Sequence, residues 1–211
     1  MQELILYVDS RFTSPWALSV FQTLTEKQLP FTLHTVDLEK GEQHQARFRD
    51  LGLTGRVPLL VHGELVLAES SAIVEYLEEA FPPPAWRAVL PAGLAQRARA
   101  RQVLAWLRSD LMALRAERTT DVVFCAPTAT PLTAAGQAAA ERLIGIAERL
   151  VTGEHLFGEW CIADSELALV LNRLILNGDP VPERLKAYAA AQWQRDSVRQ
   201  WVAKPRGQAG G

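Results

Sequence analysis

Short apolar runs separated by polar turns fill the first 80 residues, and their periods predict a small α/β domain. "LILYV" (Leu4–Val8) is aliphatic and β-branched and ends at Asp-Ser, which predicts a buried strand. Pro15 suits a first helical position, and apolar residues then recur at helical spacing to about Lys27. A strand followed by a helix is therefore expected at the start of the chain.

The next three segments continue this alternation. Residues 31–38 alternate as a second strand, and the polar segment 42–51 is expected to be helical. The two apolar runs within 57–68 flank His62-Gly63-Glu64 and predict an antiparallel hairpin. A helix over 70–81 follows, with Ser70 or Ser71 near its cap. The predicted order is β-α-β-α-β-β-α.

After "PPPAW" (Pro82–Trp86) the pattern becomes helical throughout. A leucine stripe predicts one long helix over 94–118, and the breaker "PTATPL" ends it. Further helices are predicted over 133–153, 163–177, 183–194 and 197–203. The expected domains are an α/β domain over 1–82, a linker over 83–86, an all-helical domain over 87–205 and a flexible tail over 206–211.

Composition and charge narrow the class of protein. The chain has 211 residues, 48% hydrophobic and 22% charged, with a net charge of −2, as in soluble globular proteins. Neither nucleic acid nor a membrane is expected as a partner, because there is no basic excess and no apolar run near the roughly 20 residues of a membrane span. The acidic N-terminus is unlike a signal peptide, so a cytoplasmic protein is expected.

Cysteine and histidine spacing argues against a metal site. Cys125 and Cys161 are far apart and form no CxxC motif, and the four histidines have no metal-ligand spacing. Neither a disulfide framework nor a bound metal is expected.

Two features of the α/β segment suggest a peptide-binding edge. Val57-Pro58 begins a strand, where a proline leaves an edge exposed, and a cis bond would turn the Val57 backbone outward. Glu69-Ser70 lies at a helix N-terminus, whose N–H groups attract a carboxylate, while Glu69 could accept from an ammonium. These groups could hold a short peptide with both charges, although an ordinary hairpin and capped helix would share the pattern.

The element order, Val57-Pro58 before the hairpin, "ES-x-AI" on the next helix and the helical second half together resemble the glutathione transferase superfamily. The resemblance covers nearly the whole chain and favours a bacterial-type cytosolic member. It implies a thioredoxin-like domain that binds glutathione and an all-helical domain that shapes the second-substrate site.

The resemblance also implies roles for individual residues. A cis Val57-Pro58 would pair with the cysteinyl backbone of glutathione, and Glu69 and Ser70 would hold its γ-glutamyl end. At the glycyl end the family often has polar contacts, which correspond here to three residues: Gln43, His44 and Arg56.

The stretch "FTSPW" offers two hydroxyls directly before Pro15. Glutathione chemistry needs a thiolate, and a hydroxyl at a helix N-terminus could donate to the sulfur and stabilise its charge. Two alignments with the family compete for the catalytic position, Ser14 and Thr13. Ser14 is favoured because β-branched Thr13 is less free to aim. A plain N-cap is the alternative for both.

The expected activity is conjugation of glutathione to electrophiles, reduction of organic hydroperoxides, or both. A hydroxyl-type site makes a thiol-disulfide reductase less expected, and a non-catalytic binding module is the rival class. The resemblance implies a homodimer with a small hydrophobic or electrophilic second substrate. Trp106, Arg108 and Met112 would line that pocket or the dimer seam, although an arginine-rich helix is also typical of a solvated face.

"GEWCIADSELAL" resembles the start of the central helix in the family's helical domain. Asp164 stands where it would accept the backbone N–H of the cap residue, and Cys161 replaces the usual cap hydroxyl. A structural role is expected for Asp164, and a buried, inert thiol for Cys161.

Overall fold

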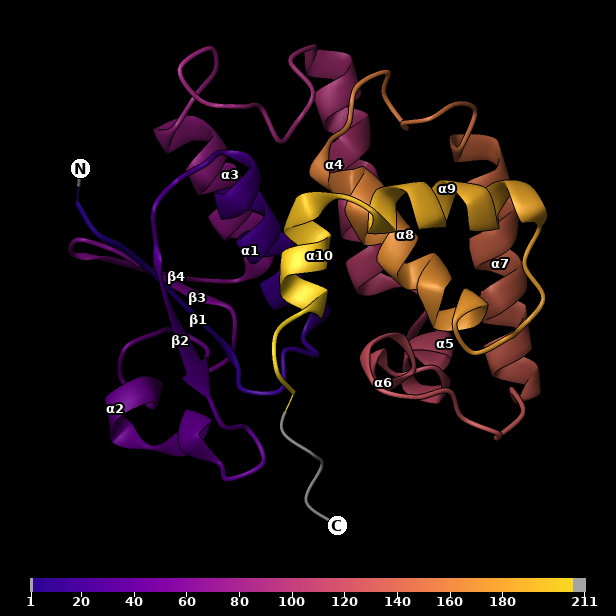
Figure 1. Cartoon of the computed structure of the whole chain (residues 1–211), viewed down its shortest axis with the longest axis horizontal. Coiled ribbons are helices and arrows are strands. Elements are labelled where there is room, and N and C mark those ends of the chain that lie inside the picture. The colour runs from indigo at the N-terminus through magenta and orange to yellow at the C-terminus, as the bar shows by residue number, and fades with distance from the viewer. Residues whose placement is uncertain (1, 207–211) are drawn as a thin grey trace. The chain divides into compact units, whose positions relative to one another are not determined.

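The structure, a computed structural model of the chain, describes residues 2–206. It divides into two compact units, a first unit of residues 2–88 with 196–206, and a helical unit of residues 89–195 (Figure 1). The flexible tail expected over 206–211 lies outside the described residues except for Arg206.

The first unit is built on a mixed sheet, and the predicted order of strands and helices is confirmed. The described strands lie in the order β2-β1-β3-β4, with β1 parallel to β2 and antiparallel to β3. The strands are β1 (Leu4–Asp9), β2 (Thr32–Val36), β3 (Leu59–His62) and β4 (Leu65–Ala68). The helices are α1 (Pro15–Glu26), α2 (Ala46–Arg49), α3 (Ser70–Ala80) and α10 (Asp196–Val202), with a single 3-10 turn over Glu42–His44.

The alternation of β1 divides the core between the two faces of the sheet. Leu4, Leu6 and Val8 are buried; α1 contacts both β1 and α3, and α3 contacts β4. Tyr7 points the other way and contacts the ring of Phe48 on α2 at 5.8 Å. The expected helix over 42–51 is therefore wrong in length: the segment forms a 3-10 turn and then one short helix, which buries Phe48 alone.

A buried ion pair connects α1 with α3, close to the segment that follows α3. Lys27 follows the last residue of α1, and its Nζ lies 2.6 Å from Glu78 Oε2 of α3, with the two side chains 0% and 2% exposed. The same ammonium donates to the carbonyl oxygens of Phe81 at 2.9 Å and Arg87 at 3.0 Å. Lys27 thus uses its three protons to hold the end of α3 and the segment that follows it.

Helix α10 belongs to the first unit, whereas the hydrophobic pattern alone groups residues 197–203 with the other late helices. Trp201 is 0% exposed, and its Nε1 donates to the Phe12 carbonyl at 3.0 Å. Its ring lies 5.3 Å from those of Phe12 and Phe21. The strand-helix domain is therefore completed by a segment nearly 200 residues later in the chain.

The helical unit packs around α8, which is buried along almost its whole length. Its described helices are α4 (Leu94–Ser109), α5 (Met112–Glu117), α6 (Thr120–Phe124), α7 (Ala134–Leu150), α8 (Ile162–Ile175) and α9 (Glu183–Trp193). Helices α4, α6, α7 and α9 all contact α8, and every residue from Ile162 to Leu174 is buried.

The predicted continuous helix over 94–118 is wrong, because the chain breaks between α4 and α5. Leu111 adopts φ +63°, and the Asp110 carboxylate accepts its N–H at 2.7 Å. The same carboxylate accepts from Trp106 Nε1 and from Arg142 on α7. An aspartate side chain that takes local backbone donors competes with helix continuation, and the leucine stripe conceals this interruption.

Within residues 2–206 no helix combines the length and apolar character needed to cross a bilayer. In the same range, no three His, Cys, Asp or Glu side chains gather as a metal-ligating group.

Replacing Lys27 by methionine should lower the free energy of unfolding by about 3–5 kcal/mol, because Glu78 is then a buried charge without its cation. Urea denaturation measures the change. Lys40→Met is the matched control, since Lys40 is 79% exposed in a surface pair with Asp37, and we expect a change below about 0.5 kcal/mol there. If the free energy of unfolding fell equally in the two variants, the buried pair would contribute no more to stability than the exposed pair.

Candidate functional site

A cavity of about 640 Å³ in the first unit gathers several of the residues singled out in the sequence. Its lining includes Ser14, Gln43, His44, Arg56 and Val57. These residues come from the start of α1 and from the segments on either side of α2, so the fold brings together positions more than 40 residues apart.

Ser14 is the N-cap of α1, and Pro15 occupies the first helical position as predicted. The Ser14 Oγ accepts the N–H of Ala17 at 3.2 Å. This bond uses a lone pair of the hydroxyl oxygen, and within residues 2–206 the hydroxyl proton has no acceptor. The proton is therefore available to a ligand atom in the cavity, next to a helix N-terminus that favours negative charge.

Thr13 has a different environment, created by Asp9 at the end of β1. Asp9 is 4% exposed, and its Oδ2 accepts both the N–H of Thr13 at 2.7 Å and the Thr13 hydroxyl at 3.1 Å. Its Oδ1 accepts the N–H of Ser14 at 3.1 Å. The Thr13 proton is thus committed to a carboxylate, and Thr13 does not line the cavity.

Sequence reasoning missed Asp9, although an aspartate a few residues before a helix start is a known local signal for this kind of bond. Its carboxylate fixes the backbone on which Ser14 stands.

The Val57-Pro58 bond is cis, and Val57 lies on the cavity directly before β3. Glu69 is the N-cap of α3, with φ +68° and an exposed side chain, while Ser70 is buried. Pro58, Glu69 and Ser70 do not line the cavity around Ser14. The structure therefore gathers only part of the predicted glutathione-contacting set in this hollow.

Several of the residues that line the cavity are polar or positively charged. Arg56 is exposed and has no acidic partner in the described part of the chain. Gln43 Nε2 lies 3.2 Å from His44 Nε2 and donates to the Leu38 carbonyl at 3.3 Å. Arg49 also lines the cavity but pairs with Asp50 at 2.8 Å. Arg56 is therefore available to pair with an anionic group in this cavity.

The three residues predicted for the second-substrate pocket, Trp106, Arg108 and Met112, lie around the break between α4 and α5. Arg108 makes two hydrogen bonds to Glu166 of α8, at 2.5 and 2.6 Å, and the two side chains are 19% and 5% exposed. Trp106 donates to Asp110, and Met112 is 63% exposed. The Arg108–Glu166 pair joins two helices, which gives Arg108 a structural contact of its own.

Two further arginines, Arg115 and Arg173, lie near this end of the helical unit. Arg173 is 4% exposed, and burial, with a smaller effect from the charge of Arg115, lowers the pKa of its guanidinium to about 10. Its Nη1 donates to the Arg118 carbonyl at 2.6 Å, at the end of α5. Burial and the charge of Arg108 also lower the pKa of Arg115. These side chains satisfy carbonyl groups at helix C-termini.

The capping prediction for Asp164 is confirmed. Its Oδ2 accepts the N–H of Cys161, the N-cap of α8, at 2.9 Å. Cys161 is 1% exposed, and burial raises the pKa of its thiol well above the ordinary value. Cys125 is exposed, on the segment after α6. Neither cysteine lines the cavity around Ser14, so that cavity contains no protein thiol.

Comparisons with known proteins agree with this architecture. The family model of the glutathione S-transferase N-terminal domain matches residues 13–80, and that of the C-terminal domain matches residues 93–206. A crystal structure of a glutathione transferase homolog from Burkholderia, with bound glutathione, is 45% identical with a TM-score of 0.80, over 95% of this chain and 97% of that one. The chain therefore belongs to the glutathione S-transferase family.

Two of the curated relatives match over shorter segments. Glutathione S-transferase 1 of Dianthus caryophyllus is 41% identical over 46% of this chain and 42% of its own length. A probable maleylacetoacetate isomerase of Vibrio cholerae is 41% identical over 40% of this chain and 39% of its own length. The chain thus spans less than half the length of these two relatives.

We expect Asp9→Asn to destabilise the protein by about 1–3 kcal/mol, because an amide group cannot accept hydrogen bonds on both of its arms and leaves a buried N–H unsatisfied. Thermal or urea unfolding measures this. In the control Asp50→Asn the side chain is exposed, and the stability should change by less than about 0.5 kcal/mol. If Asp9→Asn were as stable as this control, the hydrogen bonds from residues 13 and 14 to Asp9 would contribute little to the stability of the protein.

A thiol reagent added to the native protein at about pH 8 should modify Cys125 and leave Cys161 unmodified, because only a thiolate reacts and burial disfavours that form at Cys161. Mass spectrometry locates the label. Cys125→Ser should take up label only after unfolding, and rapid labelling of the native variant would contradict the assigned burial.

Proposed function

We propose that this protein is a glutathione transferase in which the Ser14 hydroxyl donates a hydrogen bond to the sulfur of glutathione. The observation that carries the proposal is the contrast between the two adjacent hydroxyls. Ser14 lines the cavity, and its hydroxyl has no acceptor among residues 2–206, whereas the Thr13 hydroxyl donates to Asp9. Glutathione bound to the Burkholderia homolog supports the choice of ligand.

The chemistry begins with ionisation of glutathione. A free thiol has a pKa near about 8.5, so only a small fraction is thiolate at neutral pH. A hydrogen bond from Ser14 and the positive end of the α1 dipole both favour the charged form. The protein's role at this step is to lower the free energy of the anion and hold it for attack.

The remaining groups would hold the tripeptide backbone. Arg56, with His44 beside it, offers a cationic and polar partner for the glycyl carboxylate. The exposed backbone of Val57 would pair with the cysteinyl residue. At the γ-glutamyl end, the N-terminus of α3 at Ser70 would take the carboxylate and Glu69 the ammonium.

The bound thiolate can enter two reactions. In conjugation, the sulfur forms a bond to an electrophilic carbon and the leaving group departs with its electron pair. In hydroperoxide reduction, the sulfur takes the terminal oxygen, the alcohol leaves, and a second glutathione reduces the sulfenic acid to give glutathione disulfide and water. Neither reaction needs a protein cysteine, which fits a cavity without one.

Several wider assignments accompany this proposal. The second substrate would be a small hydrophobic or electrophilic molecule, with Trp106, Arg108 and Met112 near its site. The protein would be a cytoplasmic homodimer. A non-catalytic glutathione-binding module and a thiol-disulfide reductase are the rival functions, and turnover assays separate them from the transferase.

Ser14→Ala should lower kcat/KM for a chromogenic dinitrophenyl halide by about 10–100-fold, the value of one hydrogen bond to a charged group. The kinetic pKa of bound glutathione should rise towards about 8.5. Steady-state kinetics over a pH series measures both quantities, and cumene hydroperoxide replaces the halide in a parallel assay.

Two matched variants separate thiolate stabilisation from helix capping. Ser14→Gly removes the hydroxyl, but glycine is tolerated at an N-cap. The free energy of unfolding should therefore fall by only about 0.3 kcal/mol, compared with about 1 kcal/mol for Ser14→Ala. Both variants should lose activity alike, and Thr13→Val should lose much less. Full activity in Ser14→Gly would sink the assignment of Ser14. Absence of turnover in the wild type, with retention on immobilised glutathione, would favour the binding module.

A further inference from the structure

The buried carboxylate of Asp9 lies close to Ser14 without lining the cavity around it. Asp9 is the last residue of β1 and is 4% exposed, and its Oδ1 accepts the N–H of Ser14 at 3.1 Å. A sulfur atom that accepts a hydrogen bond from the hydroxyl of the same serine would lie within about 10 Å of this carboxylate, because two hydrogen bonds and one short side chain separate them. Asp9 therefore acts on such a ligand through its charge and not through contact.

The hydrogen bonds of Asp9 are those of an ionised carboxylate. Its Oδ2 accepts the N–H and the hydroxyl of Thr13, and its Oδ1 accepts the N–H of Ser14. Backbone N–H groups can only donate, so each carboxylate oxygen acts as an acceptor, and a carboxyl proton would displace one of these bonds. Within residues 2–206 Asp9 has no cationic partner. A full negative charge is therefore retained beside the start of α1.

The N-terminus of α1 compensates for this charge only in part. Pro15 has no N–H, and the N–H of Ala17 donates to Ser14 Oγ at 3.2 Å. The N–H of Leu18 donates to the Ser14 carbonyl at 3.1 Å, as an internal bond of the helix. A helix N-terminus is equivalent to about half a positive charge, whereas a carboxylate carries a full negative one. The charge of Asp9 thus offsets the stabilisation that the helix start gives to an anion.

The other charged groups around this helix start are cationic or paired. Arg11 pairs with Glu39 at 3.1 Å, and the Lys204 ammonium lies 5.6 Å from the centre of the Phe12 ring. Helix α3 packs against α1 and contributes an acid that is already bound to a lysine, in the pair Lys27–Glu78. The lining of the cavity adds one titratable and two cationic side chains: His44, Arg49 and Arg56. Among all these groups Asp9 is the acid without a cation.

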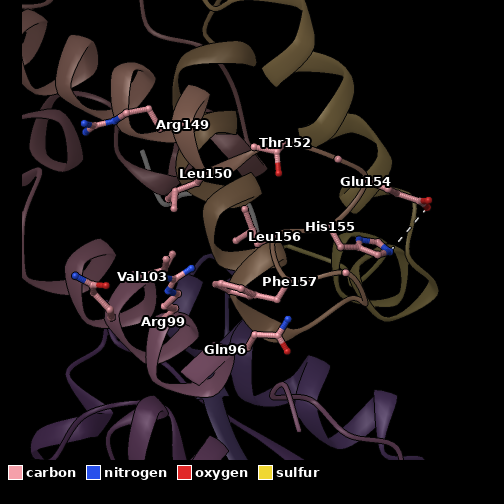
Figure 2. A pocket seen from close by; sticks show the side chains of 13 residues that line it. Gln96, Arg99, Val103, Arg149, Leu150, Thr152, Glu154, His155, Leu156 and Phe157 are labelled. Atoms are coloured by element: carbon pink, nitrogen blue, oxygen red, sulfur yellow. Dashed lines mark ion pairs between the residues drawn. The ribbon is translucent and has the colours of Figure 1, made fainter. Parts of the chain in front are cut away.

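The helical unit contains the same combination, with a protein thiol in place of a ligand. Asp164 is 0% exposed and accepts the N–H of Cys161 at 2.9 Å. It also accepts, at 2.8 Å, the N–H of Leu156, which lines a cavity of the helical unit (Figure 2). Burial and, after it, the charge of Asp164 raise the pKa of the Cys161 thiol well above its ordinary value. A buried carboxylate at a helix start thus opposes ionisation of a thiol beside it.

We propose that Asp9 is a positioning residue whose negative charge limits how far the site favours the thiolate of bound glutathione. The proposal rests on the proposed function, because it takes Ser14 as the group that binds the sulfur. Ser14 favours the thiolate and Asp9 opposes it, so the thiol ionises at a higher pH than Ser14 alone would give. A thiolate of higher pKa is the stronger nucleophile, with a Brønsted coefficient of about 0.4–0.5. Asp9 therefore lowers the amount of thiolate and raises the reactivity of each thiolate.

The test is the pH dependence of Asp9→Asn with saturating glutathione, measured by kcat/KM for the chromogenic dinitrophenyl halide and by the ultraviolet absorbance of the bound thiolate. Removing a like charge should lower the pKa of bound glutathione by about 0.5–1. Well below that pKa, kcat/KM should rise about three- to tenfold, and well above it kcat/KM should fall about twofold. A purely structural role predicts the opposite sign, because a displaced Ser14 hydroxyl raises the pKa as Ser14→Ala does.

Two further variants complete the test. Asp37→Asn is the matched control, because Asp37 directly follows β2 and accepts the N–H groups of Glu39 and Lys40 at 3.1 and 3.0 Å, but pairs with the Lys40 ammonium at 2.9 Å. It should leave the pKa of bound glutathione unchanged. Thr13→Val removes a hydroxyl that neutralises part of the Asp9 charge, so it should raise that pKa by about 0.2–0.5. Circular dichroism and thermal unfolding check that each variant is folded.

The proposal is overturned if Asp9→Asn leaves the pKa of bound glutathione unchanged or raises it, or if Asp37→Asn lowers it equally. If Asp9→Asn does not fold, an unchanged or lowered pKa in Thr13→Val overturns it instead. Failure of the proposed function gives a different result. In that case the wild type shows neither thiolate absorbance nor turnover with glutathione, or Ser14→Ala leaves the pKa unchanged, and both proposals fall together.

Discussion

The carboxylate of Asp9 is the contact on which the arrangement of the first unit's cavity depends. It lies at the end of β1 and accepts hydrogen bonds from the backbone N–H groups of Thr13 and Ser14 and from the Thr13 hydroxyl, directly before α1. Asp164 has the corresponding place in the helical unit, where it accepts from Leu156, Cys161 and Tyr188 at the start of α8. Within residues 2–206 neither carboxylate has a cationic partner, so backbone and hydroxyl donors take the place of a counter-ion. Each carboxylate therefore fixes the backbone at the start of a helix from a buried position.

The arrangement explains why two neighbouring hydroxyls differ in chemistry. The Thr13 hydroxyl donates to Asp9, and the same carboxylate accepts the backbone N–H of Ser14, whose side chain caps α1 and lines the cavity. Arg56 lines the same cavity, so its charge and the positive end of α1 both favour an anionic ligand there.

Local sequence signals predicted much of this and missed what depends on distant contacts. Pro15, Val57-Pro58 and the hairpin turn carry backbone preferences of their own, so the element order and the position of Ser14 followed from them. The break at Leu111 was not predicted, because the leucine spacing continues across it. In addition, the Asp110 carboxylate accepts a hydrogen bond from Arg142 on another helix, which no local pattern marks. The partner of Lys27 lies 51 positions away on α3, and no local pattern marks it.

The return of α10 to the first unit has a consequence for the order in which the protein can form during synthesis. Phe12 and Trp201 are separated by 189 positions. The Trp201 indole packs against the aromatic rings of Phe12 and Phe21. When the ribosome has synthesised the sheet and helices α1, α2 and α3, it has not yet made Trp201, which completes their core. The helical unit, continuous from 89 to 195, is finished first. The domain translated earliest is thus completed last, with an exposed apolar edge in the interval.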